Sequence, residues 1–513
     1  MDTESTINLF RTISRSARRF GDKTALVSHE DQRLSYAELD RLSNRFARGL
    51  SALGFSKGDH IGTLSFNANE LLIAFFGILK IGAVAVTVNV RLADPEILWL
   101  LDHSDVAALV FDSDFKDRVD ALRPDLPRLK HLIMFGGEPS PGVSAFEAIL
   151  ESGSDQESGV VVEGEDTAFI IYTSGTTGRP KGVMVTHNGF LWNCVNWSCA
   201  GSFRECDVAL QVFPLFHVAA IGSVLTHLYL GATIHIKKSF DPRDYMETIA
   251  RERINRLAAA PTVFAMLLAL PEIETYDTSS VELIGSGSAI MPTEIQRRLQ
   301  AVFPAARLFD TYGMSEASGG ITTLQTEDFH RKTACVGRPH LNLEMRVVDD
   351  DDHDVSVGQV GEVIFRGNNR MKGYYKDPEN TKSAIRDGWY HTGDMGRLDE
   401  EGFLYIVDRK KDMVITGGEN VYPREVEEVL YTHPGIAEAA VIGVPDAKWG
   451  EAVKAVIVLR PGHSAAPEEI IAFCRKHIAG YKCPKSVVFV EALPKNPIGK
   501  VLKRTLKEQY DRS

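Results

Sequence analysis

Apolar runs rich in β-branched residues alternate with helix-like patterns along most of this chain, and this alternation limits its possible folds more than any other feature. Turn-forming residues separate these apolar runs, which we expect to be strands. The clearest runs are 107–111, 131–134, 168–172, 233–236, 281–284 and 307–309. Strands that alternate with helices build sheets whose faces are covered by helices. The sequence therefore predicts an α/β fold, with a large N-terminal region of several subdomains and layered sheets.

The pattern changes in the last third of the chain. A loop rich in Gly, Ser, Pro and acidic residues is expected at 136–166, and short strands with turn signals follow residue 349. After residue 412, the predicted order is strand, helix, two strands, helix and strand, at 413–416, 423–432, 436–444, 452–459, 467–478 and 487–490. A segment with its own helices and strands can form a separate domain. We expect an N-terminal domain over 1–408, a smaller mobile α+β domain over 409–513, and a hinge at 408–412.

Charge and cysteine content exclude several classes of protein. The net charge is −12, with 57 basic and 69 acidic residues and no dense basic block, which argues against nucleic-acid binding. The 6 cysteines contain no Cys-x-x-Cys pair, so we expect reduced thiols and a cytoplasmic location. Residues 71–90 are interpreted as a buried helix and strand and not as a membrane span, because Lys80 and Gly82 interrupt them. The basic stretch 5–21 is interpreted as an amphipathic first helix over 7–20 and not as a presequence.

The most informative segment is residues 170–182, where a predicted strand enters a loop of glycines and hydroxyl-bearing residues. Glycines let the backbone approach an anion, hydroxyl and N–H groups donate to phosphate oxygens, and Lys181 can add a positive charge. The spacing is neither the Walker A pattern nor Gly-x-Gly-x-x-Gly. On composition alone, an ordinary surface loop and a phosphate-binding loop both remain open.

The full string YTSGTTGRPKG at 172–182 resembles the signature loop of the adenylate-forming superfamily, which contains acyl-CoA synthetases, carrier-linked adenylation domains and beetle luciferases. The other blocks of this family occur in the expected order: FPLFH (213–217), YGMSE (312–316), WYHTGD (389–394), DRKKD (408–412), GGENVYP (417–423) and PIGK (497–500). The resemblance covers essentially the whole chain. It implies activation of a carboxylic acid by ATP as an acyl adenylate.

The resemblance implies a nucleotide and metal site. Glu316 and Thr173 are the residues it places near Mg²⁺, and both offer the oxygen ligands that this ion prefers. Asp394 could accept hydrogen bonds from both ribose hydroxyls, Arg409 would donate to the same ribose, and Tyr312 would lie against the adenine. The remaining residues expected to bind the nucleotide are Ser174, Gly175, Thr176, Thr177, Lys181, Asp310, Thr311 and Ser315.

Other implied roles belong to the predicted C-terminal domain. In the family, the lysine that matches Lys500 bridges carboxylate and phosphate oxygens during adenylation, a task that suits a compact charge with three donors. Rotation about Lys411, at the matching hinge position, would withdraw this lysine for thioester formation. Gly417 and Gly418 would then line the path of the pantetheine arm of coenzyme A.

The acyl pocket is expected near His217, which we assign to positioning of the carboxylate and not to metal binding, because no partner lies at zinc-like spacing. Ala219 stands where plant coumarate ligases have a tyrosine, and Ile221 stands where one bacterial long-chain type has a gating tryptophan. The expected pocket wall at 285–290 carries Ser288 where Ala or Pro is commoner. This small, mostly apolar lining favours a medium-chain or long-chain fatty or fatty-like acid, and an aromatic acid is the alternative.

The sequence thus predicts an AMP-forming acid–thiol ligase that uses ATP, Mg²⁺ and coenzyme A. No carrier-protein domain follows Lys500, which favours coenzyme A as the acceptor. Three alternatives stay open: transfer of the acyl group to a separate carrier protein, an oxygen-dependent luciferase-like oxidase, and a non-catalytic nucleotide sensor. No nucleic-acid or integral-membrane partner is expected, and a homodimer is an open possibility.

Overall fold

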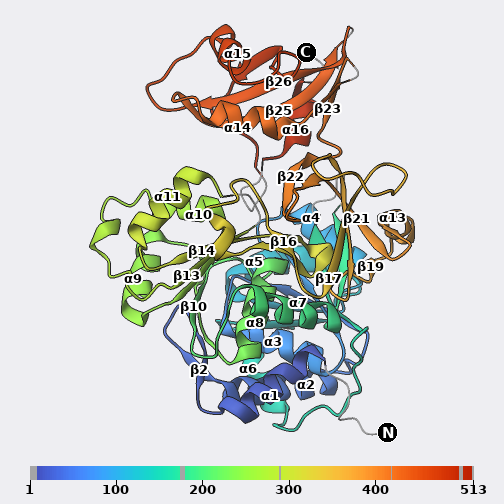
Figure 1. Ribbon diagram of the computed structural model, residues 1–513. Coiled ribbons are helices and arrows are strands. Elements are labelled where there is room, and N and C mark those ends of the chain that lie inside the picture. Colours follow the sequence, from blue (N-terminus) through green and yellow to red (C-terminus); the bar gives the residue numbers. More distant parts are fainter. Residues whose placement is uncertain are drawn as a thin grey trace. The chain divides into compact units, whose positions relative to one another are not determined.

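The computed structural model describes residues 8–173, 180–287, 291–417, 419–446, 448–495 and 501–510. The chain divides into two compact units: Met1–Glu344 with Phe365–Tyr390 form the first, and Met345–Ile364 with His391–Ser513 form the second. Within the described ranges, the strands form four sheets, and helices lie against them (Figure 1). The predicted α/β class is confirmed.

One sheet of the first unit ends in the predicted phosphate loop. Its core strands β8, β4, β3, β5 and β6 are parallel neighbours, and β9 pairs antiparallel with β8. Burial on both faces explains why these strands are continuous apolar runs in the sequence. In spatial order the strands are β19 (Gly373–Tyr374), β9 (Lys181–Thr186), β8 (Thr167–Thr173), β4 (Val84–Thr87), β3 (His60–Leu64), β5 (Ala108–Asp112), β6 (His131–Phe135) and β7 (Ser144–Ala145).

The second sheet of this unit carries most of the predicted nucleotide residues. Strands β1, β11, β10, β12, β13 and β14 are parallel neighbours, and β15 returns antiparallel to β14. Ligands of parallel sheets gather at the carboxyl ends of the strands, which is where β14 carries Tyr312. The strands are, in order, β16 (Arg338–Pro339), β15 (Gly319–Leu324), β14 (Arg307–Met314), β13 (Leu283–Gly287), β12 (Arg256–Ala259), β10 (Val208–Gln211), β11 (Thr233–Ile236), β1 (Thr24–Val27) and β2 (Arg33–Ser35).

The helices of the first unit follow clear local signals. Asn8 accepts from Arg11 N and caps the first helix, and Ser35 with Glu38 forms a capping box at the second. The helices are α1 (Leu9–Phe20), α2 (Tyr36–Ala52), α3 (Asn69–Lys80), α4 (Asp94–His103), α5 (Lys116–Leu122), α6 (Phe146–Ser152), α7 (His187–Ala200), α8 (Val218–Leu230), α9 (Pro242–Glu252), α10 (Pro261–Leu267), α11 (Thr293–Val302), α12 (Thr326–Phe329) and α13 (Pro378–Ala384).

The structure confirms one interpretation of the sequence and corrects another. The stretch 71–90 is a buried helix and strand, α3 and β4, as predicted. The expectation of a loop over 136–166 is wrong in part, because α6 lies within it. Phe146 of this helix is buried and stacks on Phe46 at 4.7 Å between ring centroids. A long-range aromatic contact of this kind stabilises a short helix that its polar surroundings conceal.

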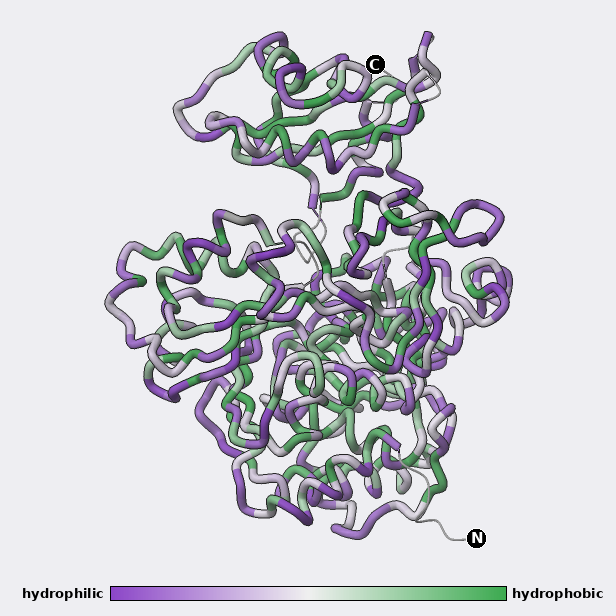
Figure 2. Tube along the Cα trace, in the orientation of Figure 1, coloured by the Kyte–Doolittle hydropathy of each residue, from purple (hydrophilic) through white to green (hydrophobic). Residues whose placement is uncertain are grey.

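The second unit contains the predicted C-terminal elements. The boundary between the units runs through a sheet of β17 (Leu343–Val348), β18 (Gly361–Gly367), β21 (Trp389–Leu398) and β20 (Ile385–Arg386), with β22 (Leu404–Arg409) beside β21. The last sheet is apolar along its long strands (Figure 2) and packs with three helices. Its elements are β24 (Glu419–Val421), β23 (Val414–Thr416), β26 (Gly450–Leu459), β25 (Ile436–Asp446), β27 (Ser486–Phe489), α14 (Pro423–Tyr431), α15 (Pro467–Arg475) and α16 (Lys503–Tyr510).

The described ranges include no helix that is long and apolar enough to cross a membrane. All 6 cysteines lie in these ranges, and no disulfide joins any two of them.

Candidate active site

The β8–β9 hairpin frames the predicted phosphate loop. Thr173, the last residue of β8, pairs with Lys181, the first residue of β9. The intervening Ser174, Gly175, Thr176 and Thr177 lie outside the described residues. The Lys181 ammonium donates to Asn380 Oδ1 at 3.0 Å and lies 4.9 Å from the centroid of the Tyr374 ring. Lys181 is therefore a localised positive charge directly beside Thr173.

The same tyrosine ties Glu316 to this hairpin. The Tyr374 hydroxyl donates to Glu316 Oε1 at 3.1 Å and lies 3.1 Å from the Tyr390 hydroxyl. Burial, followed by the negative charge of Glu316, raises the pKa of Tyr374, so its hydroxyl stays protonated as a donor. The structure thus brings Lys181 and Glu316 to opposite parts of one tyrosine side chain. Sequence reasoning missed Tyr374, which lies outside every quoted block, and gave Tyr390 no role.

Strand β14, which carries Tyr312, the residue predicted to lie against the adenine, runs directly into Glu316. Asp310 is buried, and its Oδ1 accepts from Thr311 N at 2.9 Å, while Thr311 Oγ1 donates to Ser286 O at 3.2 Å. Tyr312 follows in the same strand, and Ser315 and Glu316 form the short helical turn after it. The parallel pairing of β13 with β14 therefore holds these residues beside the described end of the predicted pocket wall. Ser288 lies outside the described residues.

His217 caps the first turn of α8, where its Nδ1 accepts from Ala219 N at 3.3 Å. Burial lowers the pKa of His217 to about 4, so the ring is neutral at physiological pH. Asn67, which sequence reasoning also missed, fixes the preceding segment: its amide donates to Phe213 O at 2.9 Å and accepts from Leu215 N at 2.8 Å. His217 is thus a neutral hydrogen-bonding group on a rigidly held turn.

In the second unit, Asp394 and Arg409 face each other across β21 and β22. Arg409 Nε donates to Asp394 Oδ1 at 2.7 Å, and Asp394 N donates to Thr392 Oγ1 at 3.0 Å. The Asp394 side chain is only 4% exposed, whereas that of Arg409 is 37% exposed. The strand pairing therefore orients a buried carboxylate with a cation beside it, as the prediction for the ribose requires.

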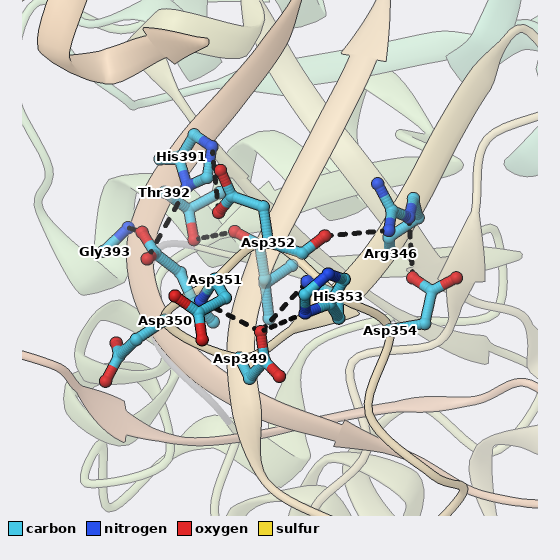
Figure 3. A network of polar contacts seen from close by, with 12 residues as sticks. Arg346, Asp349, Asp350, Asp351, Asp352, His353, Asp354, His391, Thr392 and Gly393 are labelled. Atoms are coloured by element: carbon cyan, nitrogen blue, oxygen red, sulfur yellow. Dashed lines mark hydrogen bonds and ion pairs between the residues drawn. The ribbon is translucent and has the colours of Figure 1, made fainter. Parts of the chain in front are cut away.

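The turn before Asp394 is held by an acidic network (Figure 3). His391 lies 3.9 Å from Asp352 and 3.6 Å from Glu362, and Glu362 Oε1 accepts from Gly393 N at 3.1 Å. The Lys410 ammonium reaches Glu362 at 3.3 Å and Asp350 at 2.7 Å. The same carboxylates therefore contact two segments: the turn that leads to Asp394, through Gly393 and His391, and the predicted hinge, through Lys410.

The predicted hinge has further contacts within the second unit. Asp408 accepts from Arg409 N at 2.7 Å and from Arg424 N, in the first turn of α14, at 2.8 Å. The side chain of Lys411 is exposed, and partial desolvation by the surrounding protein lowers its pKa. Gly417 has a φ of +61°, and its N–H donates to Trp449 O at 2.8 Å. Gly418 and Lys500 lie outside the described residues.

Comparisons with known proteins identify the family of this chain. Residues 13–375 match the family described as AMP-binding enzyme, and residues 425–500 match its C-terminal domain. The chain belongs to the AMP-binding enzyme family. Both the recognition of the family and the fold class are confirmed.

Individual relatives of this AMP-binding enzyme lie at moderate identity. It is 37% identical over 480 residues to the long-chain-fatty-acid–CoA ligase FadD13 of Mycobacterium tuberculosis, covering 94% of each chain. It is 36% identical over 493 residues to a feruloyl-CoA synthase of an Amycolatopsis species, covering 96% of this chain and 97% of the relative. The solved structure of an ATP-bound RpMatB–BxBclM chimera matches with a TM-score of 0.90 at 29% identity, covering 99% of each chain.

These similarities place the AMP-binding enzyme among the AMP-forming acid–CoA ligases, which confirms the predicted enzyme class. ATP is the nucleotide bound by the similar solved structure. The relatives divide between fatty and aromatic acids, so membership of the family leaves the acid open.

Proposed function

We propose that this enzyme converts a carboxylic acid, ATP and coenzyme A into an acyl-CoA, AMP and pyrophosphate. The single observation that supports this most is the arrangement at Tyr374, whose hydroxyl donates to Glu316 at 3.1 Å while Lys181 lies over its ring. A carboxylate and an ammonium held on one scaffold suit a site that binds phosphates and their counterion.

Adenylation joins two anions, because a carboxylate oxygen attacks the α-phosphorus of ATP and pyrophosphate leaves. Glu316 and Thr173 offer the carboxylate and hydroxyl oxygens that Mg²⁺ takes, and the bound ion would offset negative charge on the phosphates. Lys181 would add a fixed positive charge to the loop that also contains Ser174, Gly175, Thr176 and Thr177. Lys500 would donate to carboxylate and phosphate oxygens during this first half-reaction.

The nucleotide base and sugar are assigned to two strands. Asp394 would accept from the ribose hydroxyls, and its contact with Arg409 would hold the carboxylate in place. Tyr312 would pack against the adenine, with Asp310, Thr311 and Ser315 around it. His217, neutral and held by Ala219 N, would orient the acid without adding charge that repels or binds the phosphate.

In the second half-reaction the thiol of coenzyme A attacks the adenylate carbonyl carbon, and the bond from that carbon to the AMP oxygen breaks. We propose that the region from residue 409 rotates about Lys411, within a hinge at 408–412, between the two half-reactions. Gly417 and Gly418 would then lie along the pantetheine arm. We also propose that the enzyme works in the cytoplasm, because its 6 cysteines are free thiols and disulfides are rare in that reducing compartment.

For the acid, we propose a medium-chain or long-chain fatty or fatty-like acid, because Ala219 and Ile221 leave the start of α8 small and apolar. An aromatic acid of the benzoate or cinnamate type is the second candidate, favoured by the feruloyl-CoA synthase relative. The remaining rival is an acyl-AMP ligase that loads a separate carrier protein.

The test measures AMP release from ATP, Mg²⁺ and a panel of alkanoic and aryl acids, with and without free coenzyme A. Turnover that requires coenzyme A is expected. Exchange of pyrophosphate with ATP in the absence of any turnover dependent on coenzyme A would contradict the proposal and favour a carrier protein. Light emission or oxygen consumption from an adenylate would favour the oxidase.

A further inference from the structure

Glu362 of β18 is a buried carboxylate whose two oxygens contact two different segments of the second unit. Its side chain is only 9% exposed. Oε1 accepts from Gly393 N of β21 at 3.1 Å. Oε2 accepts from the Lys410 ammonium at 3.3 Å and lies 3.6 Å from His391 Nδ1. Because a buried charge is tolerated only when it is paired and hydrogen-bonded, these contacts explain how β18 holds a carboxylate at this position.

Gly393, the residue that this carboxylate holds, directly precedes Asp394. Its φ is +68°, in the left-handed region that glycine enters without strain, so its own backbone restricts the turn very little. Both polar groups of its backbone are bonded. The N–H donates to Glu362, and the carbonyl accepts from Lys410 N at 2.8 Å. The backbone that leads into Asp394 is therefore held on one side by the Glu362 side chain.

The threonine before this glycine forms a second link to β18 (Figure 3). Thr392 Oγ1 donates to Val363 O at 2.7 Å and accepts from Asp394 N at 3.0 Å. Glu362 and Val363 are consecutive residues, so neighbouring points of one strand hold the two residues before Asp394. The Thr392 link consists of neutral groups, whereas the Glu362 link uses a charged acceptor, which forms the stronger hydrogen bond.

Lys410 orients the Glu362 carboxylate. Its ammonium also donates to Asp350 at 2.7 Å. Desolvation by itself would lower the pKa of Lys410, but the contacts with Asp350 and Glu362 outweigh desolvation and raise the pKa, so the ammonium stays charged at physiological pH. A cation beside Oε2 keeps Oε1 directed at the N–H of Gly393.

The side chain that follows this turn has little freedom of its own. Asp394 is 4% exposed, and its Oδ1 accepts from Arg409 Nε at 2.7 Å. A buried side chain of this kind follows its backbone, so a shift of the turn moves the carboxylate oxygens as well. Hydrogen bonds weaken steeply as their geometry departs from the optimum, and binding groups must be held to within about 0.5 Å. Whatever fixes the turn therefore decides how well Asp394 can accept from a ligand.

We propose that Glu362 is a positioning residue for the nucleotide sugar: by holding Gly393, it places Asp394 so that the enzyme discriminates ATP from nucleotides that lack a ribose hydroxyl. This inference rests on the proposed function, in which Asp394 accepts from the ribose hydroxyls. Glu362 lies outside every sequence block that predicted the site. Its effect on the nucleotide should pass through Asp394 and not through a contact of its own.

The test compares kcat/KM for ATP with kcat/KM for 2′-deoxy-ATP and 3′-deoxy-ATP in the full-length enzyme, at fixed acid and coenzyme A. We expect the native enzyme to favour ATP over at least one deoxynucleotide by about 10-fold or more, the range of one hydrogen bond to a charged group. A general loss of folded enzyme lowers the rates with all three nucleotides in proportion. The ratio of the rates therefore separates a positioning role from a merely structural one.

Two substitutions of Glu362 should reduce this ratio to different extents. Glu362→Gln keeps an oxygen for Gly393 N but loses the charge that faces Lys410, so we expect a reduction of about 3-fold. Glu362→Ala removes both contacts, and we expect a reduction of about 10-fold. The nearly isosteric glutamine variant also keeps the test valid if the alanine variant folds poorly.

A double-mutant cycle with Asp394→Asn tests the route of the effect. Because Asp394→Asn already removes the charged acceptor, Glu362→Ala should change the ratio little in that background. The matched control is Glu344→Gln in β17 of the same sheet. Glu344 also binds a cation, since its carboxylate accepts from the Arg366 guanidinium at 2.7 Å and 2.9 Å. This control should leave the ratio at the native value.

An unchanged ratio in both Glu362 variants, together with a lower ratio in Asp394→Asn, would overturn the inference and leave the proposed function intact. The inference would also fail if Glu362→Ala had the same effect in the native and Asp394→Asn backgrounds, because Glu362 would then act independently of Asp394. An unchanged ratio in Asp394→Asn would instead contradict the ribose assignment of the proposed function, and the inference would fall with it.

Discussion

Arg409 Nε donates to Asp394 Oδ1 at 2.7 Å, from a position directly across the β21–β22 pair. The two residues are 15 positions apart in the sequence, and the antiparallel register brings them together. A carboxylate that accepts from one such partner still has oxygen lone pairs for other donors. This relationship makes the ribose assignment directly testable.

Asp394→Asn should raise KM for ATP and lower kcat/KM by about 10-fold to 100-fold, because hydrogen bonds to a charged acceptor are stronger than those to an amide. The melting temperature should change little, since Arg409 is partly exposed and can remain solvated. Steady-state kinetics with varied ATP provide the measurement. Glu400→Gln, at an exposed position of the same unit, is the control and should leave KM unchanged. An unaltered KM in Asp394→Asn would exclude the ribose role.

Tyr374→Phe should weaken the response to Mg²⁺. The variant loses the hydroxyl that donates to Glu316 but keeps the ring beneath Lys181. We expect the Mg²⁺ concentration for half-maximal rate to rise about 3-fold to 10-fold, which corresponds to the loss of one orienting hydrogen bond. The neighbouring hydroxyl of Tyr375 donates to Asp105 instead, so Tyr375→Phe is a matched control. The same Mg²⁺ dependence in both variants would contradict the role of Tyr374.

Local sequence patterns predicted much of the fold, because strands and helices leave local signatures. Strand β11 occupies Thr233–Ile236 as predicted, and α14 begins at the proline that marked its start. Helix α6 was missed, since its stability depends on contact of Phe146 with Phe46, 100 positions earlier in the sequence. No local pattern contains such a contact.

The residues of the candidate site also divide into those that local motifs predict and those that only the tertiary structure reveals. Motif blocks located Asp394, Arg409, Glu316 and Lys181, because each lies in a turn or at a strand end with a recognisable composition. Tyr374 and Asn67 were missed, since their importance arises only when distant segments meet: Asn67 bonds to Phe213 across 146 positions of sequence. Residues that position other side chains of a site can be found only from the tertiary structure, whereas the residues of the motifs themselves can be predicted from the sequence.

A buried histidine outside the site should make stability depend on pH. His187 is 0% exposed, its Nδ1 accepts from Leu9 N at 3.4 Å, and burial lowers its pKa to about 4. The unfolded chain, with an ordinary histidine pKa near 6.5, binds this proton first as the pH falls. The folded state therefore loses stability below about pH 6.5, by about 2 kcal/mol at pH 5 from this group alone.

His187→Asn tests this dependence, because the amide oxygen can replace Nδ1 as the acceptor and does not titrate. Urea unfolding at pH 7 and pH 5 should show a smaller loss of unfolding free energy in the variant than in the native chain. His433, a half-buried histidine of the second unit, provides the comparison as His433→Asn. Equal losses in His187→Asn and the native chain would show that His187 does not account for the effect.

Lys500→Ala should separate the two half-reactions. The lysine is proposed to stabilise negative charge only while the carboxylate attacks the phosphate, so adenylate formation should fall by about 100-fold or more. Thioester formation from supplied acyl adenylate should stay within about 3-fold of the native rate, because the leaving AMP does not depend on this residue. Single-turnover assays of each step provide the measurement, and an equal loss in both steps would contradict the assignment.

Lys411→Pro should produce the opposite pattern. Proline fixes φ near −65° and restricts the residue before it, so it limits the backbone rotation proposed for the hinge. Because Asp408 already ties this segment to Arg424 N at 2.8 Å, a stiffer hinge should favour one arrangement of the second unit and slow the other. We expect thioester formation to fall by at least about 10-fold while adenylation changes less. Lys411→Ala removes the same side chain without restricting the backbone, and its two half-reactions should both stay near native rates. If the alanine variant lost thioester formation as strongly as the proline variant, the side chain, and not rotation of the backbone, would be responsible.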